Sequence, residues 1–266
     1  MKSPKQHAVK QRPASPSSPR NPLERLLAVR PRRLAWAALA GLLAYSLAAS
    51  SSFLPTRAAE NDALEAGAAT EDAEGIVQVA NLVYAGTKSS RCFADHFLIK
   101  AQRETTIATS RRFHAVKLTG DQLYQYPLVI MTGEGDFHLA EKERQSLRKY
   151  IERGGFLLAS AGCSSTEWDR AFRREMAAIF PDNALKDVGM DHPIFSTVYE
   201  INKLEAAHGT PQPLLGISLA GRVGVIYSPD GLNDTAHTTG CCCCGGNELR
   251  NAEQINVNIL AYALTY

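Results

Sequence analysis

The chain lacks several features that would place it at once in a structural class. Its 266 residues contain only six cysteines, too few for a fold built on a disulfide scaffold. A formal net charge of +2 argues against a globally basic nucleic-acid-binding protein. We find no internal repeat, and a composition with 45% hydrophobic residues excludes a collagen-like, coiled-coil or wholly disordered chain. What remains is a chain long enough for one large domain or two small ones.

The small net charge hides two opposed blocks of charge. Residues 1–33 carry nine Lys or Arg and one Glu, whereas residues 58–75 carry six acids and no base. We expect residues 1–33, which are rich in Pro and Ser, to be a disordered tail, and residues 55–75 to be a flexible acidic linker. Residues 76–266 are nearly neutral, with 19 bases and 20 acids, and form the expected folded domain. The basic character thus belongs to the tail, and we expect no nucleic-acid partner.

Residues 34–54, LAWAALAGLLAYSLAASSSFL, contain no charged side chain. A helix of this length, at about 1.5 Å per residue, just crosses a hydrocarbon core of about 30 Å. We interpret it first as a transmembrane signal-anchor in the lipid bilayer, with the N-terminus cytoplasmic and the C-terminal domain outside the cytoplasm. A cleaved signal, which would leave a secreted or periplasmic domain, is the alternative. A cytosolic chain is a third possibility that stays open.

Apolar segments of strand and helix length alternate along the folded part. Strands are expected at residues 76–84, 127–132, 156–160, 214–219 and 222–227, the last two joined by a tight turn at Ala220–Gly221. Helices are expected at residues 91–106, 139–153, 166–180 and 253–264, with a capping box from Ser164 to Glu167 opening the third. This alternation predicts an α/β fold with a mostly parallel sheet covered on both faces. In such sheets the functional crevice lies beyond the carboxyl ends of the strands.

Several stretches of this part are similar to a known family. Residues 126–160, YPLVIMTGEGDFHLAEKERQSLRKYIERGGFLLAS, resemble the bacterial family called domain of unknown function number 4159. The likeness continues through DHPIF at residues 191–195, GRVGVIYSPDG at residues 221–231 and NVNILAYALT near the end, so it covers roughly residues 76–266. The resemblance implies a flavodoxin-like three-layer sandwich related to class I glutamine amidotransferase domains. It implies no reaction.

Cys163 is the first candidate for chemistry, because it follows the expected strand at residues 156–160. Amidotransferase-like enzymes place a nucleophilic cysteine there, on a sharp strand-to-helix turn, and a helix N-terminus would favour its thiolate. The segment AGCSS lacks the Gly-x-Cys-x-Gly of such enzymes, however, and none of His192, His208 and His237 begins a His-x-Glu pair. We therefore expect an inert residue in a tight turn, with a catalytic Cys163 as the alternative.

Three further side chains could work in the same crevice. Glu134 and Asp136, in GEGDF, could hold a cation or serve as acid and base. The competing interpretation is a solvated turn in which Asp136 caps the next helix. His192, in Asp191–His192–Pro193, could face the crevice as a base or ligand, although such a His more often packs in a turn.

The run Cys241–Cys244 is the least ordinary feature of the sequence. Cys241 and Cys244 have C-x-x-C spacing, His237 lies four residues before Cys241, and Cys163 could complete a tetrahedral set for zinc or iron. Outside the cytoplasm these thiols would instead be paired as disulfides, and that interpretation leads, ahead of a metal site or a redox function.

These observations favour a membrane-tethered domain that acts as a non-catalytic binding or interaction module of the cell envelope, with an envelope protein as a possible partner. The alternative is a cysteine- or metal-dependent enzyme, a hydrolase or a thiol redox protein, that uses Cys163 and the Cys241–Cys244 loop. Only the second hypothesis implies a cofactor.

Overall fold

The computed structural model describes residues 75–89, 92–238, 240–241 and 246–266. The expected basic tail, the apolar segment at residues 34–54 and nearly all of the acidic linker lie outside the described residues, as does Cys244. Among the helices within the described ranges, none has the length and apolar character needed to span a bilayer.

A seven-stranded sheet forms the centre of the described domain, with strand order β2-β1-β3-β4-β7-β6-β5. Its strands are β1 (Val79–Val83), β2 (His114–Lys117), β3 (Leu128–Gly133), β4 (Phe156–Ala161), β5 (Lys186–Asp187), β6 (Leu215–Leu219) and β7 (Arg222–Ser228). The neighbours from β2 through β7 pair in parallel, whereas β6 and β5 continue the sheet in antiparallel pairing. The predicted α/β fold with a mostly parallel sheet is confirmed.

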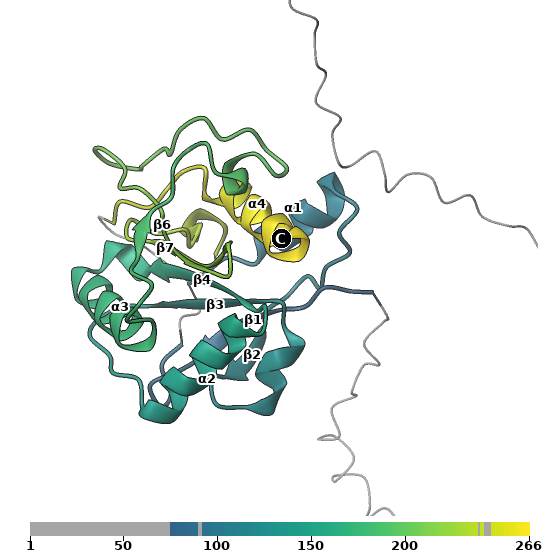
Figure 1. Cartoon of the computed structure of the whole chain (residues 1–266). Coiled ribbons are helices and arrows are strands. Elements are labelled where there is room, and N and C mark those ends of the chain that lie inside the picture. Colours follow the sequence, from purple (N-terminus) through teal and green to yellow (C-terminus); the bar gives the residue numbers. More distant parts are fainter. Residues whose placement is uncertain (1–74, 90–91, 239, 242–245) are drawn as a thin grey trace, which may run out of the picture. The chain divides into compact units, whose positions relative to one another are not determined.

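Four α-helices cover the two faces of this sheet (Figure 1). Helices α2 (Glu141–Glu152) and α3 (Thr166–Ile179) bury Leu147, Trp168 and Phe172 in the core on one face. On the other face, α1 (His96–Glu104) and α4 (Ala252–Thr265) bury Phe97, Leu98 and Ile259 in a second core. The central strand β4 is buried along its whole length, because both of its faces are covered.

Some elements differ from the sequence prediction. Strand β2 lies at the edge of the sheet with one buried residue in four, so it carried no apolar pattern, and β5 has only two residues. The helix expected from residue 91 begins at His96, and Ala94 N–H, just before it, donates to Asn233 O instead of to a helical carbonyl. The predicted capping residue was wrong by one position: Ser165, not Ser164, accepts from Trp168 N–H at the start of α3.

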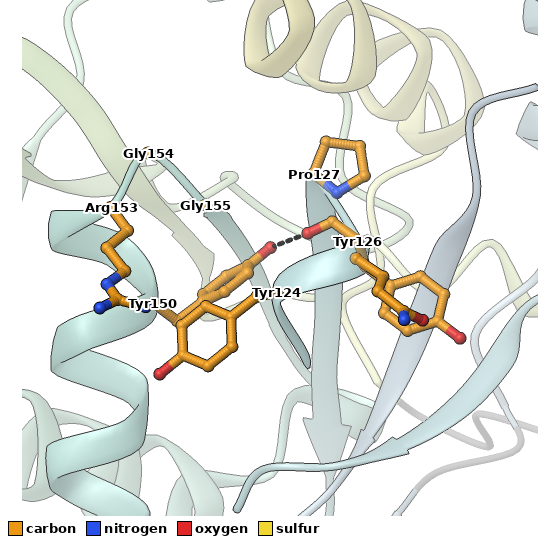
Figure 2. A pocket seen from close by; sticks show the side chains of 8 residues that line it. Tyr124, Tyr126, Pro127, Tyr150, Arg153, Gly154 and Gly155 are labelled. Carbon is orange, nitrogen blue, oxygen red and sulfur yellow. Dashed lines mark hydrogen bonds between the residues drawn. The ribbon is translucent and has the colours of Figure 1, made fainter. Parts of the chain in front are cut away.

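At the edge where the parallel strands begin, Tyr150 fills the space between α2 and the sheet (Figure 2). Its hydroxyl donates to Tyr126 O at 2.8 Å, and its ring is 2% exposed. A hollow of about 400 Å³ beside it is lined by Tyr124, Arg153 and Gly155, among others. Burial raises the Tyr150 pKa, so this hydroxyl stays protonated and serves as a structural donor.

Gly155 is predicted to be indispensable for this packing. A Cβ atom at this position would lie 2.3–2.5 Å from the Tyr150 ring, which two hydrogen bonds to the main chain hold in place. Gly155→Ala should therefore lower the free energy of unfolding by about 1–3 kcal/mol, measured by denaturant titration. Gly120→Ala is the matched control, because its Cβ would come no closer than 3.2 Å to Lys117 O. Equal denaturation midpoints for the two variants would contradict the packing.

Candidate functional site

The crevice expected beyond the carboxyl ends of the parallel strands lies beside β3, β4 and β7. Their ends are in register, since Gly133 pairs with Ala161 and Ser160 pairs with Ser228. The three segments that follow them are residues 134–137, 162–165 and 229–233. They bring three stretches of chain, far apart in sequence, to one edge of the sheet.

Hydroxyl groups at the strand ends hold residues 230–233, which we call the anchored loop. Ser160 Oγ accepts from Leu232 N–H at 2.7 Å, and Ser228 Oγ accepts from Gly231 N–H at 3.0 Å. Thr132 Oγ1 donates to Asn233 Oδ1 at 3.1 Å, in a position where Asn233 is fully buried. Each of the three strands therefore fixes one part of the loop through a buried hydrogen bond.

Cys163 sits on the sharp turn that the sequence predicted. It and Ser164 both have left-handed backbones, with φ of 49° and 52°, a conformation that is costly for residues other than Gly. Ser164 Oγ donates to Asp230 O and accepts from Asn247 N–H, each at 2.7 Å, which locks the turn. Gly246 packs over Cys163 so closely that a Cβ there would lie 2.9 Å from Cys163 Cα. The cysteine itself is half-buried.

Glu134 and Asp136 do not act together in this crevice. Both are exposed, and Asp136 Oδ1 accepts from Arg174 Nη1 at 3.1 Å, which lowers the Asp136 pKa. Asp136 does not cap the next helix, because α2 begins five residues later, after Ala140. The Glu134 side chain instead lies against Gly162, next to the turn at residues 163–164, which we call the thiol turn. Asp136 is therefore part of an ion pair, and Glu134 is the only one of the two near Cys163.

His192 lies at the opposite edge of the sheet. Its ring packs 5.3 Å from that of Tyr262, whose hydroxyl accepts from Val223 N–H near the start of β7. Strand β7 has seven residues, so this edge is about 20 Å from the crevice. His192 Nδ1 accepts from Ile194 N–H, and burial lowers the pKa of the His192 imidazole. His192 thus fills the turn, as its more common interpretation suggested.

Cys241 forms a disulfide with Cys92, 149 residues earlier in the chain. The leading interpretation of the cysteine run is borne out for Cys241, with a partner that the sequence did not suggest. A sulfur bound in this way does not ligate a metal ion as a thiolate. His237 lies on a short helical turn, Thr235–His237, and makes its contacts with other residues than Cys241.

His237 is instead part of a cluster that sequence spacing could not reveal. Its imidazole stacks on that of His96 with ring centroids 4.6 Å apart, and its Nδ1 lies 2.8 Å from Asp234 Oδ2. Glu253 Oε1 lies 2.6 Å from His96 Nδ1. One potential ligand atom each from His96, Asp234 and His237 lie within 4.8 Å of one another. Among the described residues, these three side chains form a group that could hold a metal ion.

A hollow of about 400 Å³ lies next to this cluster, at the β1 side of the sheet, and we call it the β1 hollow. It is lined by Asn81, Phe93, Ala94, Asp95, Arg112, Phe113, His237 and Thr238. Asn81 Oδ1 and Thr238 Oγ1 are buried without a hydrogen-bond partner in the part of the chain that the structure describes. The hollow thus combines two aromatic rings, an Asp–Arg ion pair of 3.3 Å and two unused polar atoms.

We expect the Cys92–Cys241 disulfide to contribute strongly to stability, since it closes a loop of 149 residues. Cys92→Ser should lower the free energy of unfolding by about 2–5 kcal/mol, measured by denaturant titration. Cys241→Ser and the double variant should lose the same amount, because each removes the same bond. Peptide mapping without reductant should recover residues 92 and 241 in one linked pair. A map that joins Cys241 to Cys163 instead would contradict this pairing.

Comparison with known proteins gives one clear result. The model of the family described as domain of unknown function, DUF4159, matches residues 78–264. No curated protein matches the chain. The matched range contains the whole sheet from β1 to β7, the thiol turn, the anchored loop and the imidazole cluster, and it ends within α4. This confirms the family that residues 126–160 suggested, and the chain therefore belongs to the DUF4159 family.

Proposed function

We propose that this chain is a membrane-tethered binding domain of the cell envelope and that its occupant lies in the β1 hollow. Residues 34–54 would hold it in the bilayer, with the domain outside the cytoplasm. The Cys92–Cys241 disulfide supports that side of the membrane, because disulfides persist in oxidising compartments. Along the parallel strands, the order β2-β1-β3-β4-β7 is the one expected of a flavodoxin-like sandwich.

The observation that carries the proposal is the unused polar surface of the β1 hollow. Within the described residues, four buried side-chain polar atoms have no hydrogen-bond partner, and two of them, Asn81 Oδ1 and Thr238 Oγ1, belong to residues that line this hollow. A buried polar group without a partner costs about 1–3 kcal/mol. A domain that keeps two such groups in one hollow is prepared for an occupant that supplies the missing donors.

The lining also indicates the class of occupant. Asn81 Oδ1 can accept from an N–H or O–H group, and Asp95 can accept from an ammonium group. The Arg112 side chain, 86% exposed, has donors available for a carboxylate. Phe93 and Phe113 offer apolar surface with ring centroids 6.1 Å apart. These features suit a zwitterionic ligand with an apolar side chain, such as an amino acid or a short peptide.

Replacement of Asn81 tests whether it is kept for binding. Because its Oδ1 has no partner, Asn81→Leu should raise the free energy of unfolding by up to about 1–3 kcal/mol, measured by thermal and denaturant unfolding of the full chain. Asn233→Leu is the matched control: both ends of that amide are hydrogen-bonded, so this variant should lose at least about 1 kcal/mol. Equal destabilisation by both changes would make Asn81 a structural residue and remove the main support for the proposal.

The occupant can be sought directly with a panel of free amino acids and dipeptides that carry one apolar or aromatic side chain. We expect one of these probes to raise the melting temperature of the full chain in detergent, by the mass action of binding to the folded state. The same probe should leave the melting temperatures of the Asn81→Leu and Arg112→Gln variants unchanged. A shift that persists in both variants would place the binding outside the β1 hollow.

The strained thiol turn favours a second function, that of a cysteine-dependent hydrolase. The left-handed Cys163, three residues before the first helical residue of α3, has the sharp strand-to-helix geometry of a nucleophile. Described histidines make their ring contacts elsewhere: His138 with Asp136 and Glu175, His192 with Tyr262, and His96 with His237. None of these contacts involves Cys163, so we place this function second.

We expect Cys163 to be less reactive than an activated thiol. With iodoacetamide at pH 7, peptide mapping of the native full chain should show slower alkylation at residue 163 than in the unfolded chain, since the side chain is half-buried and Gly246 covers its backbone. Incubation with glutamine or a nitrophenyl ester should give no turnover that Cys163→Ala abolishes. Rapid alkylation at pH 6, together with such turnover, would establish the enzyme and displace the binding module.

A further inference from the structure

Each of the two histidines in the cluster lies four residues along the chain from one of the two bonded cysteines. Cys92 lies four residues before His96, and Cys241 lies four residues after His237. The covalent bond thus joins the two segments that carry the imidazoles. A hydrogen bond of 2.8 Å from Ala94 N–H to Asn233 O joins the same segments again, between Cys92 and His96 on one side and just before Asp234 on the other. The cluster is therefore held together without a metal ion.

Each imidazole has one nitrogen against a carboxylate. His96 Nδ1 lies 2.6 Å from Glu253 Oε1, and His237 Nδ1 lies 2.8 Å from Asp234 Oδ2. A carboxylate only accepts hydrogen bonds, so these contacts place the ring proton on Nδ1 in both histidines. His96 can therefore offer its Nε2 lone pair to an ion, with Glu253 orienting the ring from outside, as carboxylates do in many metal sites. His237 would instead offer Nδ1, where the ion would replace the proton between this nitrogen and Asp234 Oδ2.

Asp234 is the carboxylate of the cluster. Its side chain is only 11% exposed, so its charge is largely removed from water. A divalent cation next to the carboxylate would offset the cost of keeping this charge out of water.

We propose that His96, Asp234 and His237 form a binding site for one divalent transition-metal ion, with zinc as the expected occupant. Two imidazole nitrogens and one carboxylate oxygen are a ligand set that zinc accepts. The ligand atoms, within 4.8 Å of one another, surround a volume that bonds of about 2.0–2.2 Å can span with a small adjustment. The imidazole planes are only 10° apart, so one ring turns out of the stack when both nitrogens bind the ion.

The proposed site lies beside the β1 hollow, because His237 belongs both to the cluster and to the lining of the hollow. Zinc sites with three protein ligands commonly keep a fourth position for water or a ligand group. The metal site is independent of what the hollow binds, since it is argued from the cluster alone. If the hollow holds a carboxylate ligand, however, the ion would offer a second cationic contact beside Arg112.

The experiment is zinc titration of the full chain, purified without an affinity tag, stripped with EDTA and kept oxidised. Remaining thiols are alkylated first, so that Cys163 and the other cysteines outside the Cys92–Cys241 bond cannot bind the metal. Calorimetry and elemental analysis should then show one zinc per chain. His96→Gln and His237→Gln should each weaken binding by more than about 100-fold, since loss of a ligand exceeds the 10–100-fold typical of outer contacts.

Two variants separate this site from nonspecific binding and from a loss of folding. His208→Gln removes an exposed histidine outside the cluster and should leave zinc affinity unchanged. Glu253→Gln keeps the size of the side chain that contacts His96 and should weaken zinc binding by about 10–100-fold without changing the circular dichroism spectrum. The site is refuted if the alkylated chain binds no stoichiometric zinc, or if His96→Gln and His208→Gln bind it equally well.

Discussion

Three hydroxyl groups at neighbouring strand ends fix the part of this molecule on which its crevice depends. Thr132, Ser160 and Ser228 each hold part of the anchored loop, residues 230–233, by a buried hydrogen bond. Inside a protein such bonds are costly to break, because the donor and acceptor atoms that lose their partners remain buried away from water. The loop therefore takes one position, and the segments before and after it are positioned with it.

The anchored loop also divides the crevice into two parts with different chemistry. At its first residue, Asp230 O accepts from Ser164 Oγ and so fixes the thiol turn. At its last residue, Asn233 O accepts from Ala94 N–H and so fixes the approach to α1, with His96 two residues later. The thiol of Cys163 and the imidazoles of His96 and His237 thus lie on opposite ends of one short loop.

The sequence predicted the interior of the fold better than its edges. Strand β4 was recognisable because an unbroken apolar run fits a strand buried on both faces, whereas β2, with one buried residue in four, had no pattern to detect. The sharp turn at Cys163 was also predictable, since its place after a buried strand sets its geometry. The imidazole cluster of His96, Asp234 and His237 was not predictable from the sequence. His96 and His237 meet only through the packing of α1 against α4 and the loop after β7. Cys92 was overlooked for the same reason, as a single cysteine far from the conspicuous run.

The Cys92–Cys241 bond has a consequence for how the domain responds to cleavage. It encloses every strand from β2 to β7 within one covalent ring, leaving β1 and α4 on the two chain segments outside. A protease that cuts any loop between the two cysteines therefore opens the ring without releasing a fragment. Such a nicked chain migrates as one species until the sulfurs are reduced. The domain can thus lose one peptide bond and still keep both halves of its crevice in one covalently linked molecule.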